Sequence, residues 1–441
     1  MARKRCWTAL APRDRLVLRR PALPVRSPVF SGYRRIFAAP GSAAFTVSGL
    51  LARFPMGMTG VGAIFMVTAE RGSYGLAGAL AATVLLVVAA AGPWLARLVD
   101  RYGQARVAVP ALAVSVAGGV AELLCLRFRA PGWTLFATAA VSGLGPNFGS
   151  LSRARWSALY RGDEAALHSA YALETVLDEL CFILGPLAAT ALATTFFPAS
   201  GFLAAMLLLL AGGLAFCAQR RSEPPVRRGA AGERGSALAS PGLRTLVASL
   251  LATGGVFGIM EITTIGFADA HHHKADASLV LACYALGSCL SGLAFGSWRP
   301  QGSAAGRLPV CLLAMTVSLA PLPFVGSLPV LAGALLLAGL TTAPTMVTSM
   351  ALVRECVPAA RLTEGFSWAT TGLLLGISAG AAVGGWAVQH LGPGAGYRIP
   401  VAASALALLI ARAGARGLRG PRRGRPEPPR AGAQADRQPM V

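Results

Sequence analysis

Residues Ala96–Val107 read ARLVDRYGQARV and place three charged side chains between two long apolar segments, with a fourth, Arg106, at the start of the second segment. The apolar segments cover residues 75–96 and 105–126. A segment of about 20 apolar residues is long enough to cross a hydrocarbon core of roughly 30 Å as an α-helix. The charged stretch is therefore predicted to be a short loop at a membrane surface, between two membrane-spanning helices.

The rest of the chain repeats this alternation. Hydrophobic residues make up 54% of the 441 residues and charged residues only 13%, with a mean hydropathy of +0.58, which excludes an ordinary soluble protein. An arginine-rich stretch at 218–243 separates six apolar segments from six more. We therefore predict an all-α membrane protein of twelve transmembrane helices in two six-helix bundles, with bundles at 43–217 and 244–415, a cytoplasmic linker at 218–243, a basic cytoplasmic tail at 1–42 (disordered over 1–30) and a basic disordered tail at 416–441. The individual segments lie at 43–69, 75–96, 105–126, 132–151, 168–195, 199–217, 244–268, 277–296, 306–326, 328–350, 364–388 and 396–415.

The basic residues predict the orientation. If both termini are cytoplasmic, the external loops hold only Arg71, Arg127, Arg129, Lys274 and Arg398, and Arg53 lies inside the first helix. The other 34 of the 40 basic residues then lie in the tails and cytoplasmic loops. This positive-inside asymmetry predicts cytoplasmic termini. The same distribution gives the net charge of +22 a role in topology and argues against a nucleic-acid partner.

The two halves carry a weak internal repeat. At a shift of 195 residues, Tyr171 aligns with Phe366, Thr175 with Thr370 and Gly185 with Gly380. Two bundles related in this way typically enclose a central path and rock against each other, as in many secondary transporters.

The loop quoted above resembles the signature loop of the major facilitator superfamily, GxLaDRxGRK. Leu98, Asp100, Arg101 and Gly103 match its key positions, whereas Ala96 replaces the first glycine and Gln104 and Ala105 replace the basic pair, with Arg106 one residue later. The resemblance extends over about residues 43–415. It implies a latch in which the aspartate contacts an arginine and the start of helix 11; the alternative is a basic loop that only determines topology.

Two glycine-rich stretches are expected to pack helices closely. The fifth segment carries Gly185-Pro186, which resembles a remnant of the antiporter motif GxxxGPxxGG, and the eleventh carries Gly376, Gly380 and Gly384 as the counterpart surface. The fourth segment departs from the pattern of drug/proton antiporters, with Ala139 and Ser142 in place of an arginine and a glutamine. The first feature favours efflux, and the second weakens the usual assignment of proton coupling.

Ionisable residues within membrane helices usually contact partners or a water-filled path. Arg53, Glu174 and Asp178 are expected at similar depth in helices 1 and 5, where they would form one cluster. That cluster is either proton-coupling machinery or a static clamp. Glu261 and Glu122 are candidate cavity acids in the outer half.

The sequence indicates no enzyme, no cofactor and no metal site. It contains no nucleophile–histidine pair and no ATP motif, and its eight cysteines have no CxxC spacing. We interpret His271-His272-His273 as part of a polar external loop, because adjacent histidines do not readily converge on one ion.

The resemblance implies a monomeric multi-pass transporter in the plasma (inner) membrane, surrounded by lipid. Its expected function is export of a small organic compound such as a drug, secondary metabolite or sugar, driven by the proton gradient. An uptake permease and a transport-dead sensor remain alternatives. The chain has only two lysines, Lys4 and Lys274, and abundant alanine and glycine, a composition that suggests a high-GC source such as an actinobacterium. For part of residues 1–30, an incorrectly assigned start is an alternative to a disordered cytoplasmic tail.

Overall fold

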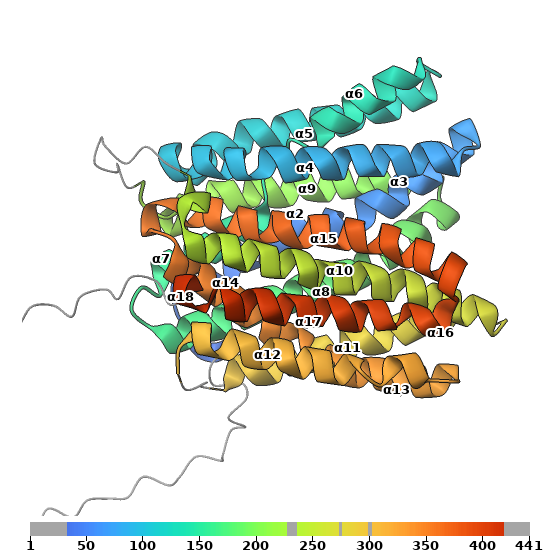
Figure 1. The fold of residues 1–441 in the computed structure, drawn as a ribbon. Coiled ribbons are helices and arrows are strands. Elements are labelled where there is room, and N and C mark those ends of the chain that lie inside the picture. The colour runs from blue at the N-terminus through green and yellow to red at the C-terminus, as the bar shows by residue number, and fades with distance from the viewer. Residues whose placement is uncertain (1–32, 227–235, 273–275, 299–301, 419–441) are drawn as a thin grey trace, which may run out of the picture.

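In the computed structural model, residues 33–418 are described except for 227–235, 273–275 and 299–301. The predicted disordered segment 1–30 therefore lies outside the described residues, as do residues 419–441 of the predicted disordered tail 416–441. Residues 416–418 of that tail belong instead to a short helix, Ala415–Leu418. The described residues contain no β-strand (Figure 1). Their helices are α2 (Ser42–Arg53), α3 (Pro55–Arg71), α4 (Tyr74–Tyr102), α5 (Gln104–Arg127), α6 (Gly132–Ser142), α7 (Phe148–Leu159), α8 (Glu164–Thr195), α9 (Ser200–Ala218), α10 (Pro241–Ala270), α11 (Ala277–Ser297), α12 (Ala304–Leu319), α13 (Leu328–Gly339), α14 (Thr342–Cys356), α15 (Leu362–Leu391), α16 (Pro393–Gly396), α17 (Arg398–Ala413) and α18 (Ala415–Leu418), with short 3₁₀ turns at Arg220–Ser222, Ala237–Ala239, Leu322–Phe324 and Ala359–Arg361.

Within the described ranges, ten helical segments are long and apolar enough to cross a membrane. The expected fourth and twelfth helices are not among them. The fourth is interrupted after Ser142, and α7 begins at Phe148 and extends to Leu159, past the predicted end at residue 151. Pro146 lacks a backbone N–H, and the Asn147 side chain caps α7 by accepting a hydrogen bond from Ser150 N at 2.8 Å. The twelfth corresponds to α17, which has only 16 residues. The exact number of spanning helices thus stays a prediction.

The first spanning segment is bent in its middle. Helix α2 ends at Arg53, and α3 begins at Pro55 within the same 30-residue segment. Because proline has no backbone N–H to donate, the helical hydrogen-bond ladder is interrupted here. The bend coincides with the buried Arg53, which is 4% exposed.

Two arginines expected in a cytoplasmic loop lie instead on a buried helix. Arg153 and Arg155 are 5% and 0% exposed on α7. The Arg155 guanidinium lies 3.7 Å from the centre of the Phe216 ring. It donates hydrogen bonds to Gln104 Oε1 (2.8 Å), Ser222 Oγ (2.8 Å) and Phe216 O (3.0 Å). The assumption that arginines mark loops failed here because polar acceptors at the end of the bundle satisfy the guanidinium.

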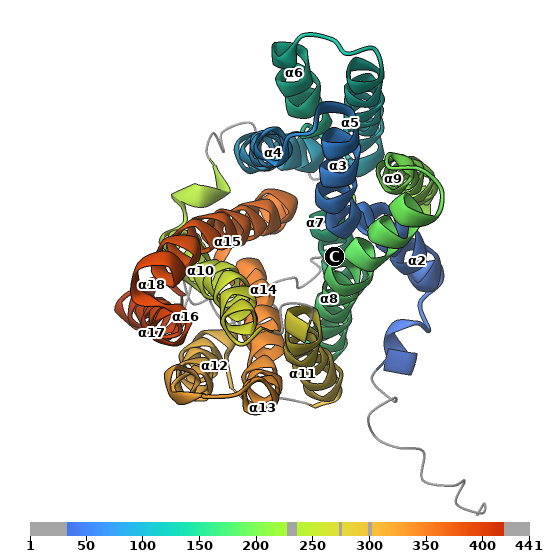
Figure 2. The same cartoon turned by 90° about the vertical axis from the view of Figure 1, so that its right-hand side faces the viewer.

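The helices form two halves. Helices α2–α9 make up the N-terminal half and α10–α18 the C-terminal half, and Figure 2 looks at them end-on. We call the end that carries the linker residues 220–226 and 236–240 the linker end, and the opposite end the far end (Figure 1). The main contacts between the halves pair α4 with α15 and α8 with α11.

The predicted glycines pack helices within each half, and not between the halves as the notion of a counterpart surface implied. Gly376 and Gly380 of α15 pack against α10, where an added Cβ would lie 2.0 Å from Leu251 O and 2.4 Å from Gly255 O. Gly384 also packs against α10, at Ile259. In the N-terminal half, Gly185 of α8 packs in the same way against Gly57 of α3. Only glycine allows the two backbones to approach this closely, because the methyl group of an alanine would collide with the facing helix.

Candidate functional site

The polar contacts between the two halves lie toward the linker end. Asp100, near the end of α4, accepts hydrogen bonds from the backbone N–H groups of Thr363 (3.2 Å) and Glu364 (2.9 Å). These donors belong to the first turn of α15, whose N–H groups have no partner within the helix. A carboxylate at this position also interacts favourably with the helix dipole. The geometry is that of a latch from α4 to α15.

Other residues of the signature loop support this contact indirectly. Gly103 adopts a φ of +100°, which side-chain-bearing residues rarely adopt, and thereby turns the chain from α4 into α5. Leu98 is partly buried. Arg101 and Arg106 are exposed, and the Arg101 guanidinium lies 5.2 Å from the ring centre of Tyr102. The expected contact of Asp100 with an arginine is not among the ion pairs of the described residues, in which Arg97 pairs with Glu364 instead.

Sequence reasoning missed the second half of the latch. Arg97 binds Glu364 at 2.8 Å, so each helix contributes a carboxylate to the junction. The Glu364 side chain is fully buried and also accepts hydrogen bonds from Ser236 Oγ and from Ala237 N (3.0 Å) in the linker. Glu364 is the first residue of the predicted eleventh helix. An acidic residue in the first turn of a helix is the sequence signal that could have identified it as part of the latch.

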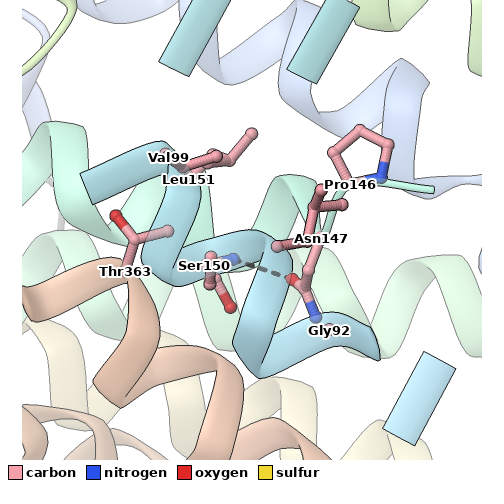
Figure 3. Close-up of a pocket in the computed structure, with 9 residues that line it drawn as sticks. Gly92, Val99, Pro146, Asn147, Ser150, Leu151 and Thr363 are labelled. Atoms are coloured by element: carbon pink, nitrogen blue, oxygen red, sulfur yellow. Dashed lines mark hydrogen bonds between the residues drawn. The ribbon is translucent and has the colours of Figure 1, made fainter. Parts of the chain in front are cut away.

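Figure 3 shows the small pocket beside this latch, where α4, α7 and α15 meet. Thr363 of α15 faces Val99 of α4 and Leu151 of α7, and the Asn147 side chain turns back to cap α7. The broken fourth helix therefore places its second half directly against the latch.

A second set of contacts joins α8 to α11. The Ser169 hydroxyl donates to Gly296 O at 2.6 Å, and His168 Nε2 lies 2.6 Å from Phe295 O. Both carbonyls belong to the last turn of α11, where carbonyl groups lack helical partners. Arg354 of α14 pairs with Glu164 at the start of α8. Toward the middle of the bundle, Ser288 Oγ donates to Glu179 Oε1 at 3.0 Å.

The segment before α2 adds a strap across the two halves. The Tyr33 hydroxyl donates to Leu293 O of α11 at 3.1 Å, and Ile36 O accepts from the Tyr160 hydroxyl at 2.7 Å in the N-terminal half. Burial raises the pKa of Tyr33 to about 12, so its hydroxyl stays protonated and remains a donor at neutral pH.

The predicted charge cluster comes together in the N-terminal half. Arg53 Nη1 lies 2.7 Å from Glu174 Oε2 and 2.8 Å from Asp178 Oδ1. Arg153, which sequence reasoning left in a loop, binds Asp178 Oδ2 at 2.6 Å. Glu174 also accepts from Ser152 Oγ and Trp156 Nε1, each at 2.7 Å. Two acids therefore face two arginines, and the cluster joins α2, α7 and α8.

The two candidate cavity acids have different surroundings. Glu122 is 2% exposed on α5, inside the N-terminal half and away from the interface between the halves. Glu261 is exposed on α10. It lies one helical turn beyond Phe257, which packs edge-on against Tyr284 of α11. Helix α10 itself is packed among α11, α14, α15 and α17.

The remaining candidates do not converge on a site. Ala139 is fully buried, and the Ser142 hydroxyl donates to its own helix at Ala139 O. His273 lies outside the described residues, and the His271 ring stacks on Phe267. Across the described ranges, no group of three or more potential ligand side chains is arranged to hold a metal ion.

Comparisons with known proteins agree with this architecture. A bacterial homologue of the iron transporter ferroportin in an outward-facing state superposes with a TM-score of 0.69 at 14% identity, over 85% of this chain and 98% of that one. The human organic anion transporter MFSD10 gives 0.61 at 18% identity, over 85% and 100% of the two chains. The transporter FucP in an outward conformation gives 0.62 at 13%, over 85% and 98%. No curated protein matches the chain. Residues 245–439 match the family model described as Major Facilitator Superfamily, and the chain as a whole has the fold of the transporters of that superfamily.

Proposed function

We propose that this protein is a secondary active transporter that exports a small organic compound by alternating access, in exchange for protons. The observation that carries the proposal is the one-sided distribution of contacts between the halves. Helix α8 contacts the C-terminal half through polar groups from Glu164 to Glu179, although it continues to Thr195. Helix α4 does so through Arg97 and Asp100 at its linker end. Among the described residues, the polar contacts between the halves thus run from the linker end to the middle of the bundle, an arrangement suited to rocking, which would open each end in turn.

This arrangement corresponds to one state of the cycle. The arginine-rich linker end is expected on the cytoplasmic side of a plasma membrane. The conformation is then the outward-facing one, with the latch of Asp100, Arg97 and Glu364 closing the cytoplasmic end. Release of the compound to the outside would take place from this state, and the latch would open for loading.

We assign the cluster of Arg53, Arg153, Glu174 and Asp178 to a clamp within the N-terminal half. With one arginine for each carboxylate, neither acid lacks a cation. Moving a proton onto either acid would leave a buried positive charge unbalanced, which is costly. The cluster holds α2, α7 and α8 together so that the N-terminal half moves as a unit.

The test is flux into inverted membrane vesicles, in which export is measured as uptake. A panel of organic cations, organic anions, sugars and ferrous iron includes the compound classes named for the structurally similar proteins. We expect accumulation of at least one class when the vesicle interior is acidic, and its loss when an ionophore dissipates the pH gradient. Accumulation only under the opposite gradient would identify an uptake permease. Binding without flux under any gradient would identify a sensor.

A further inference from the structure

The acid that remains for proton coupling lies on the same helix as the clamp. Helix α8 carries Glu174, Asp178 and Glu179 near its middle. The first two pair with arginines, whereas the structure gives Glu179 a hydroxyl partner, Ser288, and no cation among the described residues. Glu179 follows Asp178 directly and therefore lies off the helix face that Glu174 and Asp178 share. That position brings it to the interface between the halves.

The position of Glu179 along the helix is distinctive. It lies 15 residues after Glu164, or roughly 22 Å along an α-helix, so it is close to the middle of the bundle. Among the polar contacts from α8 to the C-terminal half, its bond to Ser288 is the farthest from the linker end; Ser169, His168 and Glu164 make theirs closer to that end. Opening of the linker end must therefore break this contact together with the others.

We infer that Glu179 binds the proton that is exchanged for the exported compound. In the present conformation Glu179 is partly exposed and makes the polar contact between α8 and the C-terminal half that is farthest from the linker end, so a proton would reach it from the far end. The proton binds a carboxylate oxygen, and the neutral carboxyl group can still share a hydrogen bond with the Ser288 hydroxyl. Once the linker end opens, the carboxyl group meets water from that side and releases the proton there.

The energetic reason is the absence of a countercharge. Glu179 is partly buried, and a carboxylate that is partly removed from water without a cation is unfavourable; accepting a proton removes that penalty. The closed linker end is therefore favoured by the protonated acid, and the open linker end by the carboxylate in water. The proton gradient supplies the direction: the acid takes up a proton from the far end and releases it at the linker end, and this movement would drive the proposed export.

Few other titratable groups near Glu179 could make the opening of the linker end depend on protonation. On α8 itself the neighbour is Asp178, which is held by Arg53 of α2 and Arg153 of α7. From α11, Tyr284 and Cys289 lie near Glu179, and the Tyr284 hydroxyl is paired with Thr342 of α14 at 2.6 Å. Two further thiols lie within the same helices, Cys181 on α8 and Cys283 on α11. The titratable side chains of α3, α9 and α14 lie toward the helix ends: Glu70 and Arg71 on α3, Cys217 on α9, and Arg354, Glu355 and Cys356 on α14.

The experiment measures distances across the linker end and needs no substrate. Spin labels would be attached through Arg161→Cys and Arg412→Cys, both exposed and one on each half, in a background without the native cysteines. Distances would be recorded in lipid nanodiscs from about pH 5 to pH 9, because the pKa values of buried carboxyl groups fall within this range. We expect the wild type to gain a population of long distances as pH rises, and Glu179→Gln to keep short distances throughout.

Two further variants keep the inference falsifiable. Glu122→Gln is the matched control, because it makes the same change at a buried acid of the same half away from the interface, and it should keep the wild-type pH response. Glu179→Asp retains a carboxyl group and should keep a pH response with a shifted midpoint, which provides a readout if Glu179→Gln is poorly folded. An unchanged pH response in Glu179→Gln, or none in the wild type, would overturn the inference.

The inference rests on the proposed transport function, but the two fail separately. A pH-dependent distance change that requires Glu179, together with no gradient-driven flux for any compound, would contradict proton-coupled export and leave the protonation site standing. Gradient-driven flux that survives in Glu179→Gln would support the transporter and reject Glu179 as its proton site.

Discussion

At the scale of single residues, the countercharges decide what each buried acid can do. The sequence predicted that Arg53, Glu174 and Asp178 would meet, because helical spacing and depth can be read from position in the chain. It did not predict Arg153, because that residue was placed in a loop beyond the end of the fourth helix. With Arg153 included, the charges balance, and the clamp is favoured over proton coupling at this cluster.

The clamp makes a prediction about stability. Asp178→Asn leaves Arg53 and Arg153 with one carboxylate, and breaking a buried pair in this way costs about 3–5 kcal/mol. Because the Asp178 side chain is 23% exposed, we expect the lower part of that range. Thermal unfolding in detergent should show a clear loss, partly recovered in the double variant Arg153→Met/Asp178→Leu. Unchanged unfolding combined with lost gradient-driven flux would instead assign Asp178 to proton coupling.

The latch makes a prediction about opening. Asp100→Ala removes both acceptors for the first turn of α15, which should cost about 0.5–2 kcal/mol by analogy with lost helix caps. Ser367 is 2% exposed and lies against Gly92 of α4, so a cysteine at 367 should react with a thiol reagent only when the linker end opens. We expect Asp100→Ala to accelerate this reaction about 2- to 30-fold. Asp100→Asn keeps one acceptor and should have a smaller effect; equal rates in all three proteins would contradict the latch.

At the scale of helices, glycine patterns predicted close packing and misidentified the partner. A run of small residues shows that one face of a helix lacks large side chains, but it does not indicate which neighbouring helix packs against that face. Gly376 and Gly380 approach α10 of their own half, and Gly185 approaches α3 of its own half. The breaks at Pro55 and Pro146 follow from the missing proline N–H, whereas the extension of α7 to Leu159 depends on tertiary contacts of Arg153 and Arg155.

This packing can be tested with two alanine substitutions on one helix. An added Cβ at Gly376 would lie 2.0 Å from the backbone oxygen of Leu251, which cannot rotate away, whereas Gly385 has nothing within 4 Å. We expect Gly376→Ala to destabilise the protein by about 1–3 kcal/mol. Gly385→Ala should be neutral or slightly stabilising, because alanine favours the helix. The measurement is unfolding temperature by intrinsic fluorescence, and equal temperatures for the two variants would refute the close contact between α10 and α15.

At the scale of the whole molecule, the repeat predicted more than the individual motifs did. Tyr171 and Phe366 align in the sequence, and in the structure their rings contact each other edge-on with centroids 5.9 Å apart. Equivalent residues of two repeats meet in this way when they lie near the axis that relates the repeats. The pairing of α4 with α15 and of α8 with α11 follows the same relation. The sequence could not predict which end is closed, because both states of a rocking molecule share one sequence.

A reversible link between the halves tests whether the closed end must open. An added Cβ at Gly92 would lie 3.3 Å from Ser367 Oγ, so Gly92→Cys and Ser367→Cys place two thiols within the range that a disulfide spans. Oxidation should join α4 to α15 at the linker end and abolish the flux detected in inverted vesicles, and a reductant should restore it. The matched control is Thr316→Cys/Ser404→Cys, whose native hydroxyls lie 2.7 Å apart within the C-terminal half. Because that link leaves the two halves free to separate, flux should survive its oxidation. Full flux through the α4–α15 cross-linked protein would mean that substrate crosses without separation of the halves at this contact, and alternating access by rocking would have to be abandoned.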